Sequence, residues 1–243
     1  MSHIIITGAT GLAGSAVLQS ALSSPAVSKI SILSRRPVPA AEGNPKANVI
    51  IHKDFTSYPP DLLSQLSGAS GCIWAQGISS VGMKEDEYTT ITKTYPLAAA
   101  EAFSTLPGNF NFIYISGRGA NQEGKAGQMF GRVKGAAEKA LLDVAAQKEG
   151  FSAYNLRPAG IDPGKTWTAE RKQGMIEKTF FAIAPVIRPF ASGLFTPADK
   201  LAEVSIQLAL GDGGKITGDA VLPDGYTLEN PAIRRLAGLD CRD

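Results

Sequence analysis

Three glycines near the amino terminus, Gly8, Gly11 and Gly14, have the spacing of a loop that binds phosphate groups. They lie between an apolar run at 3–7 and a helical window at 12–23. Glycine lets the chain turn tightly there and bring its backbone against a pyrophosphate, which the positive end of the helix then faces. An ordinary strand-to-helix turn would also contain glycine, but this position favours a nucleotide site. The residues expected to contribute are Thr7, Gly8, Thr10, Gly11, Leu12 and Gly14.

The residues that follow the second apolar run, Ser34, Arg35 and Arg36, indicate NADP(H) rather than NAD(H). An NAD site usually has an acidic residue at this strand end, which accepts the ribose 2′-hydroxyl, and the first acid here is Glu42. Guanidinium groups beside the adenosine ribose favour a 2′-phosphate instead. A solvated basic turn would give the same pattern. We expect NADP(H) as the cofactor.

Two further strand ends would complete the nucleotide site. Asp54 and Phe55 follow the third apolar run, where a carboxylate can accept a hydrogen bond from the adenine amino group and a ring can pack on the base. Ala75, Gln76 and Gly77 follow the fourth run, where the backbone would pass beside the cofactor. Plain strand-ending turns would explain both features equally well.

Alternating strands and helices must position these residues. Strands are expected at 3–7, 29–34, 48–52, 71–75, 110–116 and 151–158, helices at 12–23, 58–66, 85–104, 130–148 and 197–211, and a short strand near 216–223. Apolar strands joined by helical crossovers pair in parallel. The expected fold is therefore α/β, a Rossmann-type doubly wound parallel sheet with helices on both faces. Residues 1–243 would form a single NAD(P)-binding domain, with a small substrate-pocket region at about 159–200.

With these motifs the sequence resembles the short-chain dehydrogenase/reductase superfamily, and most of all its atypical or extended branch, which includes epimerase-like fungal proteins. The TGxxGxxG loop at 7–14 carries the resemblance, which covers about residues 1–165. It implies that Ser116 and Lys134 are catalytic and that Lys134 also holds the nicotinamide ribose. It further implies that the backbone after the sixth strand borders the nicotinamide, at Pro158, Ala159, Gly160 and Ile161.

Phe130 stands where the superfamily has its catalytic tyrosine, four residues before Lys134. Phenylalanine cannot donate a proton, and losing a positioned acid commonly lowers a rate by about 10²–10⁴-fold. Another donor would then be needed for a carbonyl substrate: Tyr95, Tyr114, Lys134, Ser116 or a water. Strand alternation puts Tyr114 on the same face as Ser116 but a layer deeper, and packing in the core would explain either tyrosine more readily.

Three functions are compatible with this site. The first is an NADP(H)-dependent reductase of a small to medium, largely apolar carbonyl, enone or imine; a conjugated C=C or an iminium needs less help from an acid because no strongly basic alkoxide forms. The second is a redox-neutral cyclase or isomerase, in which the apolar stretch 178–195 holds the substrate, since positioning contributes up to about 7–11 kcal/mol. The third is a non-catalytic NADP(H) sensor. We expect the reductase.

The composition restricts partners and location. The net charge of +2 gives no sign of a nucleic-acid partner. Charged residues and prolines interrupt the apolar segment 175–195, so it is not expected to span a membrane, while peripheral attachment is left open. No signal peptide is apparent, and Cys72 and Cys241 match no metal or redox spacing. We expect a cytoplasmic protein without a metal site.

Small residues on the expected helix at 130–148 bear on the oligomeric state. Ala136, Ala140 and Ala145 lie beside a row of larger apolar residues at helical spacing. Such a face allows a second copy of the chain to pack closely, and packing on the protein's own sheet explains the same pattern. The sequence is therefore compatible with a monomer or a homodimer.

Overall fold

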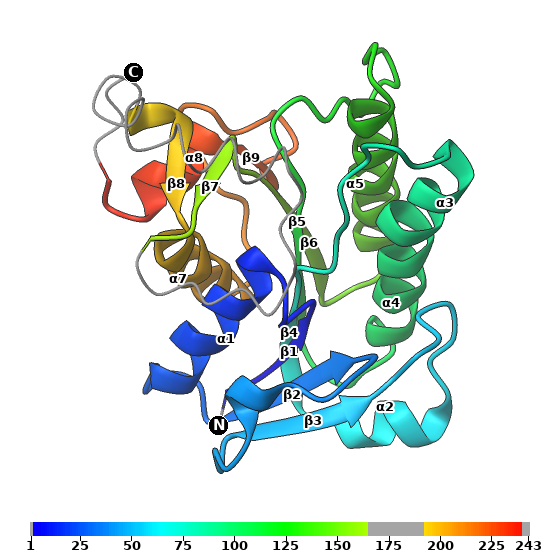
Figure 1. Cartoon of the computed structure of the whole chain (residues 1–243), viewed down its shortest axis with the longest axis vertical. Helices are drawn as coiled ribbons and strands as arrows, with labels where there is room; N and C mark the ends of the chain where they lie inside the picture. Colours follow the sequence, from blue (N-terminus) through cyan, green and yellow to red (C-terminus); the bar gives the residue numbers. More distant parts are fainter. Residues whose placement is uncertain (1, 165–191, 240–243) are drawn as a thin grey trace.

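Seven parallel strands form the central sheet of the structure, a computed structural model that describes residues 2–164 and 192–239 (Figure 1). They are β1 (His3–Thr7), β2 (Lys29–Ser34), β3 (Ala47–Ile51), β4 (Ala69–Trp74), β5 (Phe110–Ile115), β6 (Phe151–Arg157) and β9 (Thr227–Glu229). Their order is β3-β2-β1-β4-β5-β6-β9, and all neighbours are parallel. Two short strands, β7 (Gly160–Asp162) and β8 (Phe195–Pro197), pair separately.

Helices cover both faces of this sheet (Figure 1). They are α1 (Leu12–Ser23), α2 (Pro60–Leu66), α3 (Glu85–Thr89), a π-helical segment (Thr90–Thr94), α4 (Tyr95–Phe103), α5 (Met129–Gln147), α7 (Ala198–Ala209) and α8 (Asn230–Leu236). Helices α1, α7 and α8 contribute to one apolar core, and α2, α4 and α5 to the other. All five residues of β1 are buried, as expected for a strand covered on both faces. The expected doubly wound fold is confirmed.

One expected strand is wrong. The sequence predicts a strand near 216–223, whereas the last strand of the sheet is β9, and Val221 makes only a single antiparallel bridge to Leu228. Ala220 has a φ of +61°, which is incompatible with an extended strand, and Gly218 has a φ of +105°. Two left-handed residues so close together turn the chain before it can extend, and Pro223 follows them.

The expected helix at 85–104 is interrupted at its centre. Residues Thr90–Thr94 form a π-helical turn between α3 and α4. A π-turn carries one extra residue and leaves a main-chain carbonyl free for another partner. The carbonyl of Thr92 uses that freedom to accept a hydrogen bond from the hydroxyl of Tyr114, at 2.9 Å.

The region expected to form the substrate pocket, about 159–200, is described in part. It contains β7 and β8, whereas residues 165–191, with most of the apolar stretch 175–195, lie outside the described residues, as does Cys241. Within the residues that the structure describes, none of the helices has the length and apolar character that crossing a bilayer requires.

Candidate nucleotide and active site

A cleft of about 590 Å³ lies at the carboxyl ends of β1, β2 and β4. Its volume is typical of a small-molecule or cofactor site. Neighbouring strands β2 and β4 continue the chain on opposite sides of β1, so the cleft lies where the strand order reverses, the usual ligand position in such sheets. It is lined by Gly8, Ala9, Thr10, Gly11, Leu33, Ser34, Arg35, Arg36, Phe55, Ala75, Gln76, Gly77 and Ile78.

The glycine loop is shaped by close backbone contacts. Gly8 has a φ of +68°, and a Cβ built on it would lie 2.5 Å from the carbonyl oxygen of Ala75. A Cβ on Gly14 would lie 2.0 Å from the carbonyl oxygen of Gly8. Helix α1 begins after Gly11 with no side chain capping its first turn. The uncapped amides and the positive end of the helix dipole fit a pyrophosphate group.

Arg35 and Arg36 lie at the end of β2 with exposed side chains. Neither guanidinium group makes a hydrogen bond or ion pair with a described residue, and only the backbone amide of Arg36 is bound, by the Ser34 hydroxyl at 3.3 Å. Two uncompensated guanidinium groups at the rim of the cleft are suited to a phosphate that has no other cation.

Phe55 forms part of the cleft, but its neighbour Asp54 does not. The Phe55 ring is buried and contacts the rings of Trp74 and Tyr95, with centroids 5.8 and 5.9 Å away. Asp54 is exposed, and its carboxylate accepts hydrogen bonds from the Thr56 hydroxyl and amide. These bonds hold the pKa of Asp54 below its usual value. The expected contact between Asp54 and adenine stays a prediction.

Lys134, on α5, is anchored at the end of β5. Its Nζ donates to the carbonyl oxygens of Ser116 at 2.7 Å and Ile115 at 3.2 Å, and lies 5.5 Å from the centre of the Phe130 ring. Burial lowers the pKa of Lys134 to about 8, and the Glu138 carboxylate opposes this shift. An ammonium group has three donors, so one remains for a ligand.

The side-chain position of residue 117, rather than the side chain of Ser116, faces Lys134. A Cβ built on Gly117 would lie 2.9 Å from Cζ of Phe130 and 3.9 Å from Nζ of Lys134. The hydroxyl of Ser116 points away and donates to Oε1 of Glu138 at 2.5 Å. The Ser116 hydroxyl is buried and its proton is already donated to Glu138, and the role expected for it, orienting a substrate oxygen, stays a prediction. Successive residues of an extended chain point to opposite sides.

The two tyrosines considered as proton donors are packed against other side chains, and the centre of the Tyr114 ring lies 5.8 Å from Nζ of Lys134. Tyr114 is buried, its hydroxyl donates to the carbonyl of Thr92, and burial raises its pKa well above the ordinary value. Tyr95 is half-buried against Phe55 and is not among the residues that line the cleft. Packing therefore accounts for both side chains, and neither hydroxyl has a contact with Lys134 among the described residues.

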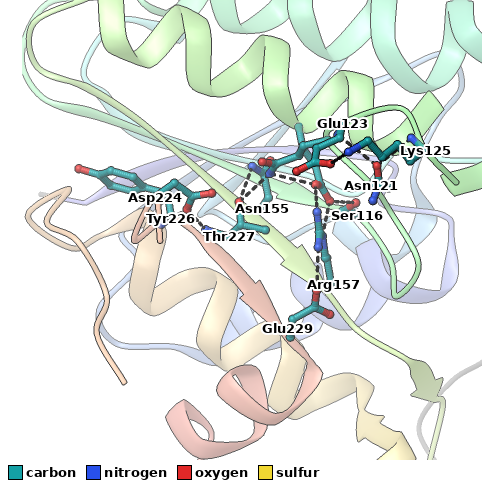
Figure 2. Close-up of polar contacts among 12 residues, drawn as sticks. Ser116, Asn121, Glu123, Lys125, Asn155, Arg157, Asp224, Tyr226, Thr227 and Glu229 are labelled. Atoms are coloured by element: carbon teal, nitrogen blue, oxygen red, sulfur yellow. Dashed lines mark hydrogen bonds and ion pairs between the residues drawn. The ribbon is translucent and has the colours of Figure 1, made fainter. Parts of the chain in front are cut away.

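A buried polar cluster behind Ser116 was missed by the sequence analysis (Figure 2). Arg157, at the end of β6, donates from Nε to Oε1 of Glu138 at 2.9 Å and from Nη2 to Oε2 at 2.5 Å. Its Nη1 donates to Glu229 on β9 at 2.7 Å. Gln122 bridges Glu138 and Thr227. An acid one helical turn after Lys134, and an arginine ending an apolar strand, were the available signals.

The segment after β6 is held by main-chain and side-chain bonds. The carbonyl of Pro158 accepts a hydrogen bond from the amide of Arg118, and the amide of Ala159 donates to Asn230 on α8, each at 3.0 Å. Gly160 and Ile161 pair with β8. None of these four residues lines the cleft, so their expected contact with the nicotinamide stays a prediction. The same applies to Thr7, Leu12 and Gly14, which lie beside the cleft without lining it.

Comparison with known proteins places this architecture among related chains. No family model matches the sequence. The leucinostatins biosynthesis cluster protein T of Purpureocillium lilacinum is 33% identical over 252 residues, covering 93% of this chain and 87% of the relative. The mitochondrial protein fmp52 of Aspergillus clavatus is 24% identical over 242 residues, covering 98% of this chain and 86% of the relative.

Solved structures share the fold at low sequence identity. The PhqB reductase domain from Penicillium fellutanum superposes with a TM-score of 0.68 at 15% identity, covering 95% of this chain and 67% of that one. The enzyme WbmF of Bordetella bronchiseptica, in complex with NAD⁺ and UDP, superposes with a TM-score of 0.67 at 13% identity, covering 99% and 78%. These likenesses concern the arrangement of strands and helices.

Proposed function

The chain belongs to the family of the leucinostatins biosynthesis cluster protein T and has the fold of the short-chain dehydrogenase/reductase superfamily, and from this premise we propose that it is an NADP(H)-dependent oxidoreductase. The cleft at the ends of β1, β2 and β4 would hold the cofactor. The bound NAD⁺ of WbmF supports a nicotinamide dinucleotide as the ligand class. The names of the relatives support a small-molecule substrate of a biosynthetic pathway.

The residues that would hold NADP(H) are those in the cleft and beside it whose hydrogen-bond donors have no partner among the described residues. The uncapped start of α1 would bind the pyrophosphate, and Arg35 and Arg36 the 2′-phosphate. The third donor of Lys134 would bind the nicotinamide ribose. The cofactor, when bound, supplies or accepts a hydride. Preference for NADP(H) over NAD(H) is part of the proposal and rests on the two arginines.

The proposed substrate class depends on one observation, which is that Gly117 and Phe130 lie beside Lys134. Gly117 and Phe130 present no proton donor, and the ring of Phe130 fills the space where a side chain at 117 would lie. A ketone needs a proton as hydride arrives, because an alkoxide develops. We therefore propose an electron-poor C=C or an iminium as the acceptor. Hydride adds to the β-carbon and water protonates the resulting enolate, or hydride adds to an iminium carbon and gives an amine directly.

A redox-neutral cyclisation or isomerisation is the second candidate, because the same apolar pair favours reactions that depend on orientation alone. The two candidates differ in cofactor consumption. The cyclase or isomerase would convert its substrate with no change in NADPH absorbance, whereas the reductase would oxidise one NADPH for each product formed.

A cytoplasmic location and a monomeric or homodimeric state stay predictions. One relative is named as a mitochondrial protein, so the location of the tagged chain in the cell should be measured.

The test is a substrate panel of enones, iminium ions and simple ketones, assayed with NADPH. The unmodified protein should oxidise NADPH with an enone or iminium and leave ketones unchanged. The double variant Gly117→Ser, Phe130→Tyr, in which the ring at 130 has to shift away from the new side chain at 117, should gain ketone reduction of at least about 10²-fold over the unmodified protein. Gly117→Ala with Phe130→Leu is the matched control, which alters the same space without adding a hydroxyl.

Three outcomes would contradict the proposal. Ketone reduction by the unmodified protein at the rate of the double variant would mean that another group supplies the proton. Product formation without NADPH oxidation would establish the redox-neutral candidate. Tight NADPH binding with no conversion of any panel member would point to a cofactor sensor.

A further inference from the structure

The end of β5 holds Lys134 through main-chain atoms of Ser116. Both hydrogen bonds of the Lys134 ammonium to the protein go to carbonyl oxygens, those of Ile115 and Ser116. The position of the ammonium therefore depends on the orientation of the peptide groups at 115–117. The amide of Ser116 is fixed from the other side by the carbonyl of Leu156, at 2.8 Å.

The side chain of Ser116 is fixed by a buried ion pair. Its hydroxyl donates to Glu138, which has no exposed surface and binds Arg157 through both carboxylate oxygens. Arg157 in turn binds Glu229, which is about one-third exposed. Figure 2 shows Ser116, Arg157 and Glu229 in this order, from the end of β5 across β6 to β9.

Burying Glu138 and Arg157 is costly, because both charges lose their hydration. Replacing such a pair by apolar residues of similar volume is often neutral or stabilising, so stability alone gives a weak reason for it. The charges along the chain of contacts alternate in sign, from Lys134 through Glu138 and Arg157 to Glu229. Glu138 is the charged group that affects Lys134, and the Tyr114 and Phe130 rings are its other close side-chain neighbours among the described residues.

We propose that Glu138 and Arg157 are positioning residues for Lys134, which they orient through Ser116. Glu138 acts in two ways: it fixes the Ser116 peptide whose carbonyl binds the ammonium, and its charge keeps the ammonium protonated. Arg157 holds the carboxylate in place and prevents it from being a lone buried charge. The effect on NADPH binding rests on the proposed function, in which Lys134 holds the cofactor. The effect on the position of Lys134 rests on the hydrogen bonds and ion pairs alone.

The first experiment needs no cofactor. The reactivity of Lys134 toward an amine-acylating reagent is measured across pH by peptide mass spectrometry in the unmodified protein, Ser116→Ala, Glu138→Gln and Glu229→Gln. Ser116→Ala should raise the reactivity at every pH, because the ammonium is less firmly held. Glu138→Gln should move the midpoint of the titration to lower pH, because the negative charge is removed. Glu229→Gln, which touches neither Ser116 nor Lys134, is the control and should leave the profile unchanged.

The second experiment measures NADPH binding by the same proteins. Ser116→Ala and Glu138→Gln should bind NADPH about tenfold more weakly, as expected for losing one hydrogen bond that involves a charged group, and Glu229→Gln should bind normally. Unchanged reactivity of Lys134 in a folded Ser116→Ala protein would overturn the positioning role, whether or not Glu138→Gln folds. Failure of the unmodified protein to bind NADPH would contradict the proposed function, and the reactivity profiles would still decide the positioning role.

Discussion

Lys134 combines a buried ammonium with an apolar surrounding, and its protonation governs what it can bind. Its pKa is lowered to about 8 because burial disfavours the charged form, so the lysine is protonated below this pH and loses its charge as the pH rises through it. We expect NADPH affinity to fall as the pH rises above about 8, a range in which the 2′-phosphate of NADPH is already fully ionised. Fluorescence titration of NADPH across this range measures the effect.

Two variants serve as controls for this pH dependence. Lys134→Met should bind NADPH weakly at all pH values, because the donor and the charge are both lost. Lys134→Arg carries a guanidinium group that stays protonated throughout this pH range, so any NADPH binding that it retains should not fall there. An affinity of the unmodified protein that stays flat up to pH 9 would show that Lys134 does not hold the cofactor as a cation.

At the residue scale, the sequence indicated Lys134, Phe130 and Ser116 as neighbours, and the structure adds that Ser116 contacts Lys134 through its carbonyl oxygen while its hydroxyl donates to Glu138. The expected strand at 110–116 is one residue longer than β5, which ends at Ile115. Side chains alternate along an extended chain, but the sequence does not indicate on which side of the chain residue 116 points. Glu138 and Arg157 are separated by 19 residues and meet only in the folded chain, so their pairing had no local signal.

The proposed nucleotide binding depends on the junction between the glycine loop and α1. A methyl group at residue 14 would lie 2.0 Å from the carbonyl oxygen of Gly8, and a backbone atom cannot rotate away as a side chain would. Gly14→Ala should lower the free energy of unfolding by about 1–3 kcal/mol, as overpacking usually does, and should weaken NADPH binding more than tenfold. Thermal denaturation and titration of the purified variant measure both quantities.

Gly127→Ala is the matched control for this prediction. A Cβ on Gly127 meets no atom within 4 Å, and its φ lies outside the left-handed region, so the free energy of unfolding should change by less than about 0.5 kcal/mol. Gly14→Ala binding NADPH as tightly as Gly127→Ala would mean that the loop does not contact the phosphates.

At the element scale, apolar runs predicted the strands well because β1, β2, β4, β5 and β6 consist mostly of buried residues, and the partly exposed β3 still carries the apolar run 49–51. The helix at 12–23 agrees with α1 in both bounds. The sequence failed where backbone geometry departs from regular repeats. The π-turn at Thr90–Thr94 preserves a helical residue pattern and so has no distinct periodicity, and the left-handed Ala220 is of a residue type that normally avoids this conformation.

The proposed preference for NADP(H) over NAD(H) depends on the distribution of charge around the cleft. Arg35 and Arg36 make no ion pair with a described residue, so a 2′-phosphate would bind them without breaking an existing contact. Replacing both by alanine should weaken NADPH binding by about 10²-fold, at roughly 1.5 kcal/mol for each charge-assisted bond, and change NADH binding little. Equilibrium titrations with both cofactors measure this preference.

The control for the arginine variant is Lys148→Ala, which removes an exposed cation at the far end of α5. It should leave the ratio of NADPH to NADH affinity unchanged. An unchanged ratio in the double arginine variant as well would contradict the proposed cofactor specificity while leaving nucleotide binding itself intact. Raising the salt concentration should reduce NADPH affinity in the unmodified protein more than in the double variant, because exposed charges are screened.

At the scale of the whole molecule, the doubly wound fold and the position of the cleft were predictable because both follow from the order of strands and helices. Residues from four different strand ends, among them Gly8, Arg36, Phe55 and Gln76, meet in one cleft as expected. The substrate side was not predictable in the same way. It depends on the segment after Pro158, whose sequence contains no recognisable motif, and its apolar part lies largely outside the described residues.

Ser116 and Gly117 are adjacent in the chain but have different surroundings, one in the protein interior and the other beside Lys134. The side chain of Ser116 is bound in the interior by Glu138, whereas a side chain at 117 would lie beside Lys134 and against the ring of Phe130. A lineage could therefore exchange residue 117, and with it residue 130, while the interior contacts of residue 116 stay as they are. Because the two sets of contacts are separate, substitutions at 117 and 130 can change the chemistry of the site and leave the buried contacts that stabilise the fold unchanged. Descendants of one ancestral chain can in this way acquire or abandon an acid without rebuilding the scaffold that carries it.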